Sequence, residues 1–296
     1  MIQTRTVLYG GKEAWCMAGA RSVIDLSGEY KKKAPVILHG TSSFYTDTIK
    51  ENGFGREPVY RRICRLILPE IQKAFGRMNA KSPSEDGELL NSGITAYILS
   101  SPGGVYVTNN IVTSLDYSCG TSGGFGEMLY ETLAYYTAFY QLYGSYPELS
   151  CEEHERFVKQ FVDEGSGRVK IKCSPVVYVL RNLPVSSLRH EDGSLINFTT
   201  KLTSFINNEQ HQRLKENLPY MDTSSYPLKD YLTKWTPSVQ IYKGDPIPYD
   251  SITEVTVKGE LPFFYFSDSE ETRLEKERSL RSLRTLMAEK LAELLL

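Results

Sequence analysis

The sequence has 296 residues, of which 41% are hydrophobic and 24% charged, so the chain can bury a sizeable core in one large domain or two modest ones. The formal net charge of −2 excludes a global basic surface for nucleic acid, so any such binding must use a local patch. The sequence has neither a signal-peptide pattern nor the roughly 18 consecutive apolar residues of a membrane span. Five scattered cysteines favour a reducing compartment, so we expect a cytoplasmic protein.

The first strong element in the chain is the segment VILHG at 36–40. Three aliphatic residues followed by His-Gly-Thr predict a buried strand that ends at His39 in a polar turn. A short helix is predicted at 47–54, with Gly53 at its C-terminal cap. A second helix is predicted at 59–75, where Pro69 should kink or split it.

The rest of the chain mixes strands and helices with long segments between them. Strands are predicted at 94–100, 104–108, 174–184 and within 252–266, helices at 110–118, 127–143, 151–163 and 269–296, loops at 80–92 and 120–126, and mixed helix and loop over 186–250. The helix at 127–143 is rich in aromatic residues, which favours core packing over a surface that binds a substrate. Because strands and helices do not alternate regularly, we predict an α+β core with insertions.

Three short segments carry a resemblance when they are taken together. They are HGTSSFYTDTIKENGFG at 39–55, GVYVTNNIVTSLDYSC at 104–119 and TEVTVKGELPFFYF at 253–266. In this order they resemble the NAD-dependent ADP-ribosyltransferases of the His-Tyr-Glu type, the branch of diphtheria toxin and the poly(ADP-ribose) polymerases. The third segment is most similar to the glutamate strand of DNA-modifying toxins of toxin–antitoxin systems. The resemblance implies a split β-sheet catalytic core with helical insertions over 1–268, followed by a long C-terminal helix at 269–296.

The resemblance also implies NAD+ as substrate and a set of residues that bind it. His39 would bond the adenosine ribose, the backbone of Gly40 would bind the nicotinamide amide, and Thr41 would belong to the same His-Gly-Thr site. Ser114 would support the amide through a further hydrogen bond. No metal is implied. Read without the family, a histidine at a strand end is more often a structural residue than a ligand.

Two tyrosines and a glutamate complete the implied site. Tyr106 and Tyr117 would flank the nicotinamide, since an aromatic slot suits a flat cation. Glu254 would bond the 2′-hydroxyl of the nicotinamide ribose and stabilise the positive charge that develops at the anomeric carbon. Glu260 is a rival, but Glu254 opens its strand whereas Glu260 follows Gly259 at the strand end. Catalysis would therefore rest on His39, Tyr106 and Glu254.

The acceptor of the ADP-ribose stays open at this point. The toxin-like glutamate strand favours transfer of a single unit to DNA or RNA, with protein as the alternative. Water is a further alternative acceptor, and a catalytically inactive NAD-fold interaction module is a third reading from a different class. Arg56 and Arg61 are candidates for the pyrophosphate by position alone, and Lys31 to Lys33 with Arg61, Arg62 and Arg65 could contact a nucleic-acid backbone. A charge run is more often a solvated face.

Two further features have more than one reading. Cys151 and His154, in CEEH, form half of a metal-like pair, but no second half follows at a suitable spacing, so no zinc site is predicted. The C-terminal helix carries an apolar stripe, which consists of Leu280, Leu283, Met287, Leu291 and Leu294. The stripe is predicted to pack on the chain's own domain, and the alternative is a surface for an antitoxin, a chaperone or another protein.

Overall fold

A computed structural model describes residues 6–9, 12–15, 36–77, 104–108, 111–120, 124–181, 183–189 and 240–295. In chain order the elements are β1 (Thr6–Tyr9), β2 (Lys12–Trp15), β3 (Val36–Ser42), η3 (Ser43–Tyr45), α2 (Thr46–Asn52), α3 (Val59–Arg77), β4 (Val105–Val107), α5 (Ile111–Cys119), α6 (Glu127–Tyr143), α7 (Glu152–Lys159), β5 (Pro175–Arg181), η5 (Val185–Ser187), β6 (Leu188–Arg189), β7 (Gln240–Tyr242), η6 (Tyr249–Ser251), β8 (Thr253–Thr256) and α10 (Glu270–Leu295). Helices and antiparallel sheets are mixed, so the predicted α+β class is confirmed. Within these ranges, none of the helices combines the length and the apolar character that a bilayer span needs.

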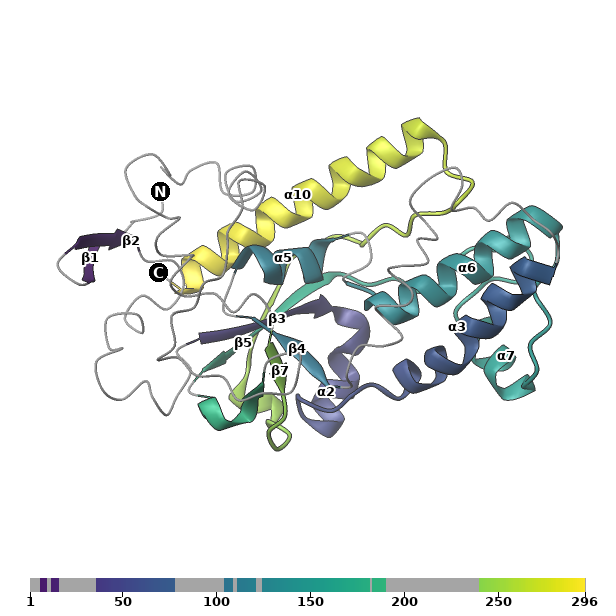
Figure 1. The fold of residues 1–296 in the computed structure, drawn as a ribbon. Coiled ribbons are helices and arrows are strands. Elements are labelled where there is room, and N and C mark those ends of the chain that lie inside the picture. Colours follow the sequence, from purple (N-terminus) through teal and green to yellow (C-terminus); the bar gives the residue numbers. More distant parts are fainter. Residues whose placement is uncertain are drawn as a thin grey trace.

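Two three-stranded antiparallel sheets form the centre of the described structure (Figure 1). One has the order β3-β5-β8 and the other the order β4-β7-β6, while β1 and β2 pair with each other. The two sheets meet where Leu38 and Thr108 exchange backbone hydrogen bonds of 2.6 and 2.8 Å. This junction brings β3 beside β4, so the segment around His39 lies next to the segment around Tyr106.

The register of the first sheet aligns residues that are far apart in the sequence. His39 on β3 lies opposite Tyr178 on β5, and Tyr178 lies opposite Glu254 on β8. Side chains of directly opposed residues point to the same face of a sheet, so these three form one row. The predicted strand end at His39 is wrong, because β3 continues to Ser42 through pairing with the N-terminal half of β5.

Helix α5 covers the other face of β3 at very short range. A Cβ atom added at Gly40 would lie 1.9 Å from the carbonyl oxygen of Ser114 and 2.9 Å from the backbone nitrogen of Ser118. Only glycine allows two backbones to approach this closely. Gly40 is therefore required by the packing of α5 on β3.

Helices α3, α6 and α7 group together at one end of the structure (Figure 1). Helix α6 is buried on nearly all sides, from Met128 to Phe139, so the prediction that its aromatic residues pack in the core is confirmed. Helix α3 is continuous through Pro69, so of the predicted kink or split the split is wrong. Leu68 and Ile71, next to the proline and two residues after it, are fully buried, and their packing stabilises the helix at this point.

Several predicted boundaries change in the structure. Helix α2 ends at Gly53 with φ of 77°, as predicted. Helix α7 ends at Lys159 instead of residue 163, because the chain turns there and Val162 pairs with Val169. The predicted strand-rich segment 252–266 contains only β8, and the predicted helix-and-loop stretch contains the short strands β6 and β7. The predictions for 80–92, 94–100 and Lys31 to Lys33 lie outside the described residues.

Helix α10 crosses α5 along one side of the molecule (Figure 1). Four residues of its apolar stripe are buried in the core, namely Leu280, Leu283, Met287 and Leu291, whereas Leu294 is 40% exposed. Arg284 pairs with Asp116 of α5 at 2.5 Å, and the ammonium group of Lys290 donates to the Thr256 carbonyl of β8 at 2.8 Å. The stripe thus packs on the chain's own domain, which is the first of the two readings.

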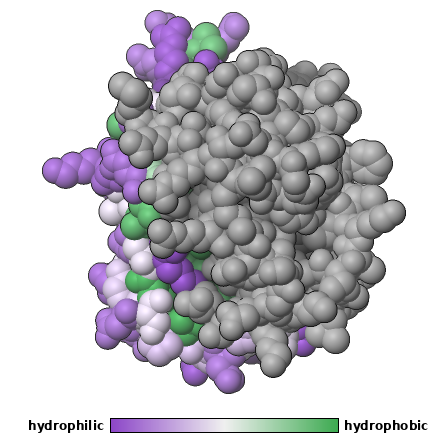
Figure 2. Space-filling view, turned by 90° about the vertical axis from the view of Figure 1, so that its left-hand side faces the viewer, coloured by the Kyte–Doolittle hydropathy of each residue, from purple (hydrophilic) through white to green (hydrophobic). Residues whose placement is uncertain are grey.

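The surface near these elements is mainly polar. On the face shown in Figure 2, the described residues are mostly hydrophilic, and the hydrophobic ones appear in small groups between them. The large apolar side chains of α10 that stay exposed, Leu274, Leu286 and Leu294, are each only 40–45% exposed. Single exposed leucines of this kind are normal on a protein surface.

Candidate functional site

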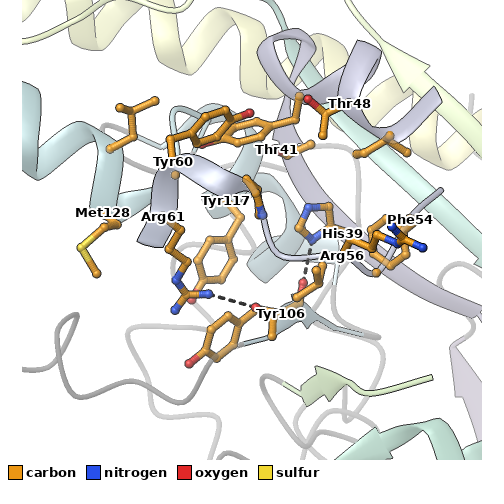
Figure 3. Close-up of a pocket in the computed structure, with 18 of the residues that line it drawn as sticks. His39, Thr41, Thr48, Phe54, Arg56, Tyr60, Arg61, Tyr106, Tyr117 and Met128 are labelled. Carbon is orange, nitrogen blue, oxygen red and sulfur yellow. Dashed lines mark hydrogen bonds between the residues drawn. The ribbon is translucent and has the colours of Figure 1, made fainter. Parts of the chain in front are cut away.

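A cavity of about 170 Å³ lies between β3, β4, α2, the start of α3 and the start of α6. Its lining includes five of the predicted site residues, which are His39, Gly40, Thr41, Tyr106 and Tyr117. Arg56 and Arg61 also line it, together with further aromatic and apolar residues, namely Tyr45, Ile49, Phe54, Tyr60, Met128 and Leu129 (Figure 3). Mostly apolar walls with a few convergent polar groups are typical of a small-molecule site.

His39 is held in one orientation and one protonation state. Its Nδ1 lies 2.6 Å from the Tyr106 carbonyl oxygen, and since a carbonyl can only accept, Nδ1 carries the proton (Figure 3). Its ring makes an edge contact with Phe54 at 5.1 Å and stacks on Tyr178 at 6.4 Å between centroids. Burial lowers the pKa of His39 to about 4, against a smaller opposing effect of the bond to Tyr106. The imidazole is neutral at pH 7, and Nε2 is a hydrogen-bond acceptor suited to a hydroxyl group.

Tyr106 and Tyr117 form an aromatic slot with a cation beside it. The guanidinium carbon of Arg61 lies 5.7 Å from the centroid of the Tyr106 ring, and Figure 3 shows it close to both tyrosines. Arg61 is held there by its hydrogen bond to the Gly104 carbonyl at 2.9 Å and by an ion pair with Glu57 at 3.1 Å. A guanidinium is a planar cation, and its position over Tyr106 is a cation–π contact.

Aromatic residues of η3 and α3 also line the cavity, and Figure 3 shows Tyr60 of α3 above the other labelled tyrosines. Tyr45 and Tyr60 contact each other with ring centroids 5.6 Å apart, and the Tyr45 hydroxyl donates to the Phe125 carbonyl. Burial raises the pKa of Tyr45 well above its usual value and raises that of Tyr60 as well. Both hydroxyls are therefore neutral donors at physiological pH, and the wall carries no negative charge from them.

Glu254 lies just beyond the lining of the cavity, on the same face of the sheet as His39. The two residues are separated by Tyr178 on the middle strand, which puts their Cα atoms about 10 Å apart at ordinary strand spacing. The Glu254 side chain is partly exposed, and its Oε2 accepts a hydrogen bond of 2.9 Å from the Tyr249 hydroxyl. The rival Glu260 is exposed and follows β8 in a segment without regular structure.

Ser114 lies on the opposite face of β3 from His39. Its side chain is fully buried and donates to the Ile111 carbonyl within α5 at 2.8 Å. It does not line the cavity, because α5 packs its backbone directly against Gly40. The structure therefore brings His39, Tyr106 and Tyr117 together with Gly40 at one cavity, and it keeps the Ser114 hydroxyl away from it.

Two tyrosines next to Glu254 were not predicted from the sequence. Tyr178 is fully buried between His39 and Glu254, and Tyr249 precedes β8 by one short turn. The available signal for Tyr178 was its position as the one residue with a polar group in the run VVYVL. A tyrosine in a buried strand needs a partner for its hydroxyl, which is a reason to look for polar neighbours.

The predicted half of a metal site remains incomplete in the part of the chain that the structure describes. Cys151 and His154 lie at the start of α7, and the described ranges contain no group of three or more His, Cys, Asp and Glu side chains that could hold a metal ion.

Comparison of the chain with protein-family models, with curated proteins and with solved structures gives no match. These comparisons therefore assign no family to the chain.

Proposed function

We propose that this protein is an NAD+-dependent ADP-ribosyltransferase that releases nicotinamide and transfers one ADP-ribose unit to a macromolecule. The observation that carries the proposal is that two distant segments meet at one cavity, while the third lies in the same sheet as His39. His39 bonds the backbone of Tyr106, and Glu254 lies in the same cross-strand row as His39. These are the three residues that the resemblance to the His-Tyr-Glu transferases assigns to catalysis. Two small antiparallel sheets joined at Leu38 and Thr108 agree with the split sheet that it implies.

Each side chain can supply a part of the chemistry. The slot of Tyr106 and Tyr117 suits the pyridinium ring of NAD+, and the neutral His39 can accept a hydrogen bond from a ribose hydroxyl. A cavity of about 170 Å³ is smaller than the roughly 300–1,000 Å³ typical of sites for larger ligands, so it would enclose one end of the dinucleotide. The other end would lie towards the exposed Arg56.

Glu254 would act on the ribose of the nicotinamide half. When the bond between the ribose anomeric carbon and the pyridinium nitrogen breaks, its electron pair leaves with nicotinamide and the sugar becomes positively charged. A carboxylate that accepts the 2′-hydroxyl hydrogen bond opposes that charge. The acceptor atom then forms a bond to the anomeric carbon and loses its proton.

A nucleic acid is our preferred acceptor, and the protein would then be a toxin-like or defence-related enzyme of the cytoplasm. This preference comes from the similarity of the segment at 253–266 to the glutamate strand of DNA-modifying toxins, which is an argument by analogy. Two exposed arginines near the cavity, Arg56 and Arg62, could contact phosphates. A protein side chain is the alternative acceptor.

The test is incubation of the purified protein with labelled NAD+ and cell lysate, followed by nuclease or protease treatment. We expect nicotinamide release and a labelled product that nuclease removes. Glu254→Gln should lower kcat by about 10²–10³-fold and change the Kd for NAD+ little, because its charge acts mainly in the transition state. Glu260→Gln is the matched control, since it removes an exposed carboxylate on the same segment. Equal loss in both variants, or folded wild-type protein without nicotinamide release, would refute the proposal.

A further inference from the structure

Two tyrosine hydroxyls lie beside the Glu254 carboxylate, and neither belongs to the residues discussed so far for binding or catalysis. Tyr249 donates to Glu254 Oε2 at 2.9 Å. Tyr178 occupies the position directly opposite Glu254 on β5, with its side chain on the same face of the sheet. Glu254 itself lies on a strand of only four residues and is partly exposed. A side chain in such a position needs external contacts to stay in one rotamer.

Contacts of the residues before and after Tyr249 in the sequence, and of its own ring, hold it in place. The turn η6 fixes its backbone, because the Ile252 amide donates to the Tyr249 carbonyl at 2.9 Å. Two residues before it, Ile247 exchanges backbone hydrogen bonds of 2.8 Å with Phe54, the residue whose ring contacts His39. The ammonium group of Lys50 lies 5.5 Å from the centroid of the Tyr249 ring. The position of the hydroxyl is thus tied to the same elements that build the cavity.

Tyr178 is held more tightly still. Its ring is fully buried, stacks on His39, and its hydroxyl shares a 2.8 Å hydrogen bond with the Thr46 side chain at the start of α2. Burial raises the pKa of Tyr178, and the negative charge of Glu254 raises it further. The hydroxyl therefore keeps its proton and can act as a hydrogen-bond donor. If Thr46 donates in the bond that the two hydroxyls share, the Tyr178 hydrogen is left for a second acceptor on the face of the sheet where Glu254 lies.

We infer that Tyr249 and Tyr178 are positioning residues for Glu254, which hold its carboxylate in the orientation needed at the nicotinamide ribose. This inference rests on the proposed function. The bond from the Tyr249 hydroxyl to Oε2 restrains the rotation of the carboxylate, whose further lone pairs can accept a hydrogen bond from a ribose hydroxyl. A displacement of a catalytic group by about 1 Å can reduce the rate by about 10²-fold, so the loss of either hydroxyl should act on kcat.

The experiment compares Tyr249→Phe with wild type in the release of nicotinamide from NAD+. We expect kcat to fall by about 10–100-fold while KM for NAD+ stays within about threefold, because the ring and its contacts remain and only the hydroxyl is lost. Tyr146→Phe is the matched control. It removes a tyrosine hydroxyl that donates to the Asp163 carbonyl, and these two residues follow α6 and α7 and lie outside the sheet that carries Glu254. Tyr178→Phe should show the same division between kcat and KM, with a lower Tm because the hydroxyl is buried.

A double-mutant cycle separates positioning from a general structural role. If Tyr249 acts through Glu254, Tyr249→Phe should have almost no further effect on kcat in the Glu254→Gln background. A Tyr249→Phe enzyme as active as Tyr146→Phe, or an equal loss in both backgrounds, overturns the inference and leaves the proposed function intact. Folded wild-type protein that releases no nicotinamide overturns both.

Discussion

Replacement of Gly40 by alanine tests the way the sheet and α5 form the site. The added Cβ would lie 1.9 Å from the Ser114 carbonyl oxygen, whereas real Cβ contacts essentially never fall below 3.0 Å, so the backbones must separate by about 1 Å. The clashing atoms belong to the backbone of a packed helix and cannot be relieved by a rotamer change. Overpacking of a core costs about 1–3 kcal/mol, and we expect the upper part of this range for Gly40→Ala.

The assay is urea denaturation followed by helical circular dichroism. Gly40→Ala should lower the midpoint with little change in the m value, because the surface exposed on unfolding is nearly the same. Gly165→Ala is the control, since its added Cβ would have only an ordinary contact of 3.6 Å with Asp163. We expect that variant to stay within about 0.5 kcal/mol of wild type.

The same substitution should also change the lining of the cavity. Tyr117 is carried by α5, so a helix displaced from β3 takes that ring with it and should raise KM for NAD+. A Gly40→Ala protein with wild-type stability would refute the packing of α5 on β3 described above. A protein with lower stability but unchanged KM would refute the role of Tyr117 in the slot.

The remaining predictions concern pH, packing and thiol reactivity. The pKa of His39 is about 4 in the folded protein, against an ordinary value of 6.5. Its contribution to the free energy of unfolding is therefore complete above pH 6.5 and falls as the pH drops towards 4, by about 3 kcal/mol in the limit. His39→Gln should flatten the fall of Tm over this window, and an unchanged slope would contradict the burial of His39. Leu291→Ala should lower the free energy of unfolding by about 2–5 kcal/mol, whereas Leu286→Ala, at an exposed position of the same helix, should change it by less than about 0.5 kcal/mol. Cys151→Ser should lower by one the number of thiol groups that react rapidly with a thiol reagent in the native protein, because the Cys151 thiol is partly exposed. An unchanged number of rapidly reacting thiols would show that Cys151 is covered.

The elements with strong local patterns could be predicted from the sequence. The buried strand at β5, the aromatic helix α6 and the leucine-bearing helix α10 each carry a pattern long enough to specify the element without knowledge of its neighbours. The strands β6 and β7 have only two and three residues, which is too short for any period to appear. They form because β7 pairs with β4 and β6 pairs with β7, and such pairing is a property of the folded chain.

The candidate site was predictable in its residues more than in its arrangement. The resemblance proposed His39, Tyr106 and Glu254, of which the structure brings His39 and Tyr106 to one cavity and leaves Glu254 outside its lining. The row that contains Tyr178 depends on the register of three strands from distant parts of the chain. The expected strand end at His39 failed for the same reason, since pairing with β5 extends β3 beyond the point where its apolar run stops. The position of Ser114 could not be predicted, because it depends on the face of β3 that α5 covers.

The junction between the two sheets has a consequence for motion. In the described structure the backbone bonds that join them are the pair between Leu38 and Thr108, and the next contact along the seam is the bond from His39 to the Tyr106 carbonyl. Backbone bonds at a single residue pair can open while the ladder of β3, β5 and β8 stays intact. Tyr106 and Glu254 lie in different sheets, so such an opening would change the distance between them. Hydrogen exchange at the Leu38 and Thr108 amides would report that opening directly.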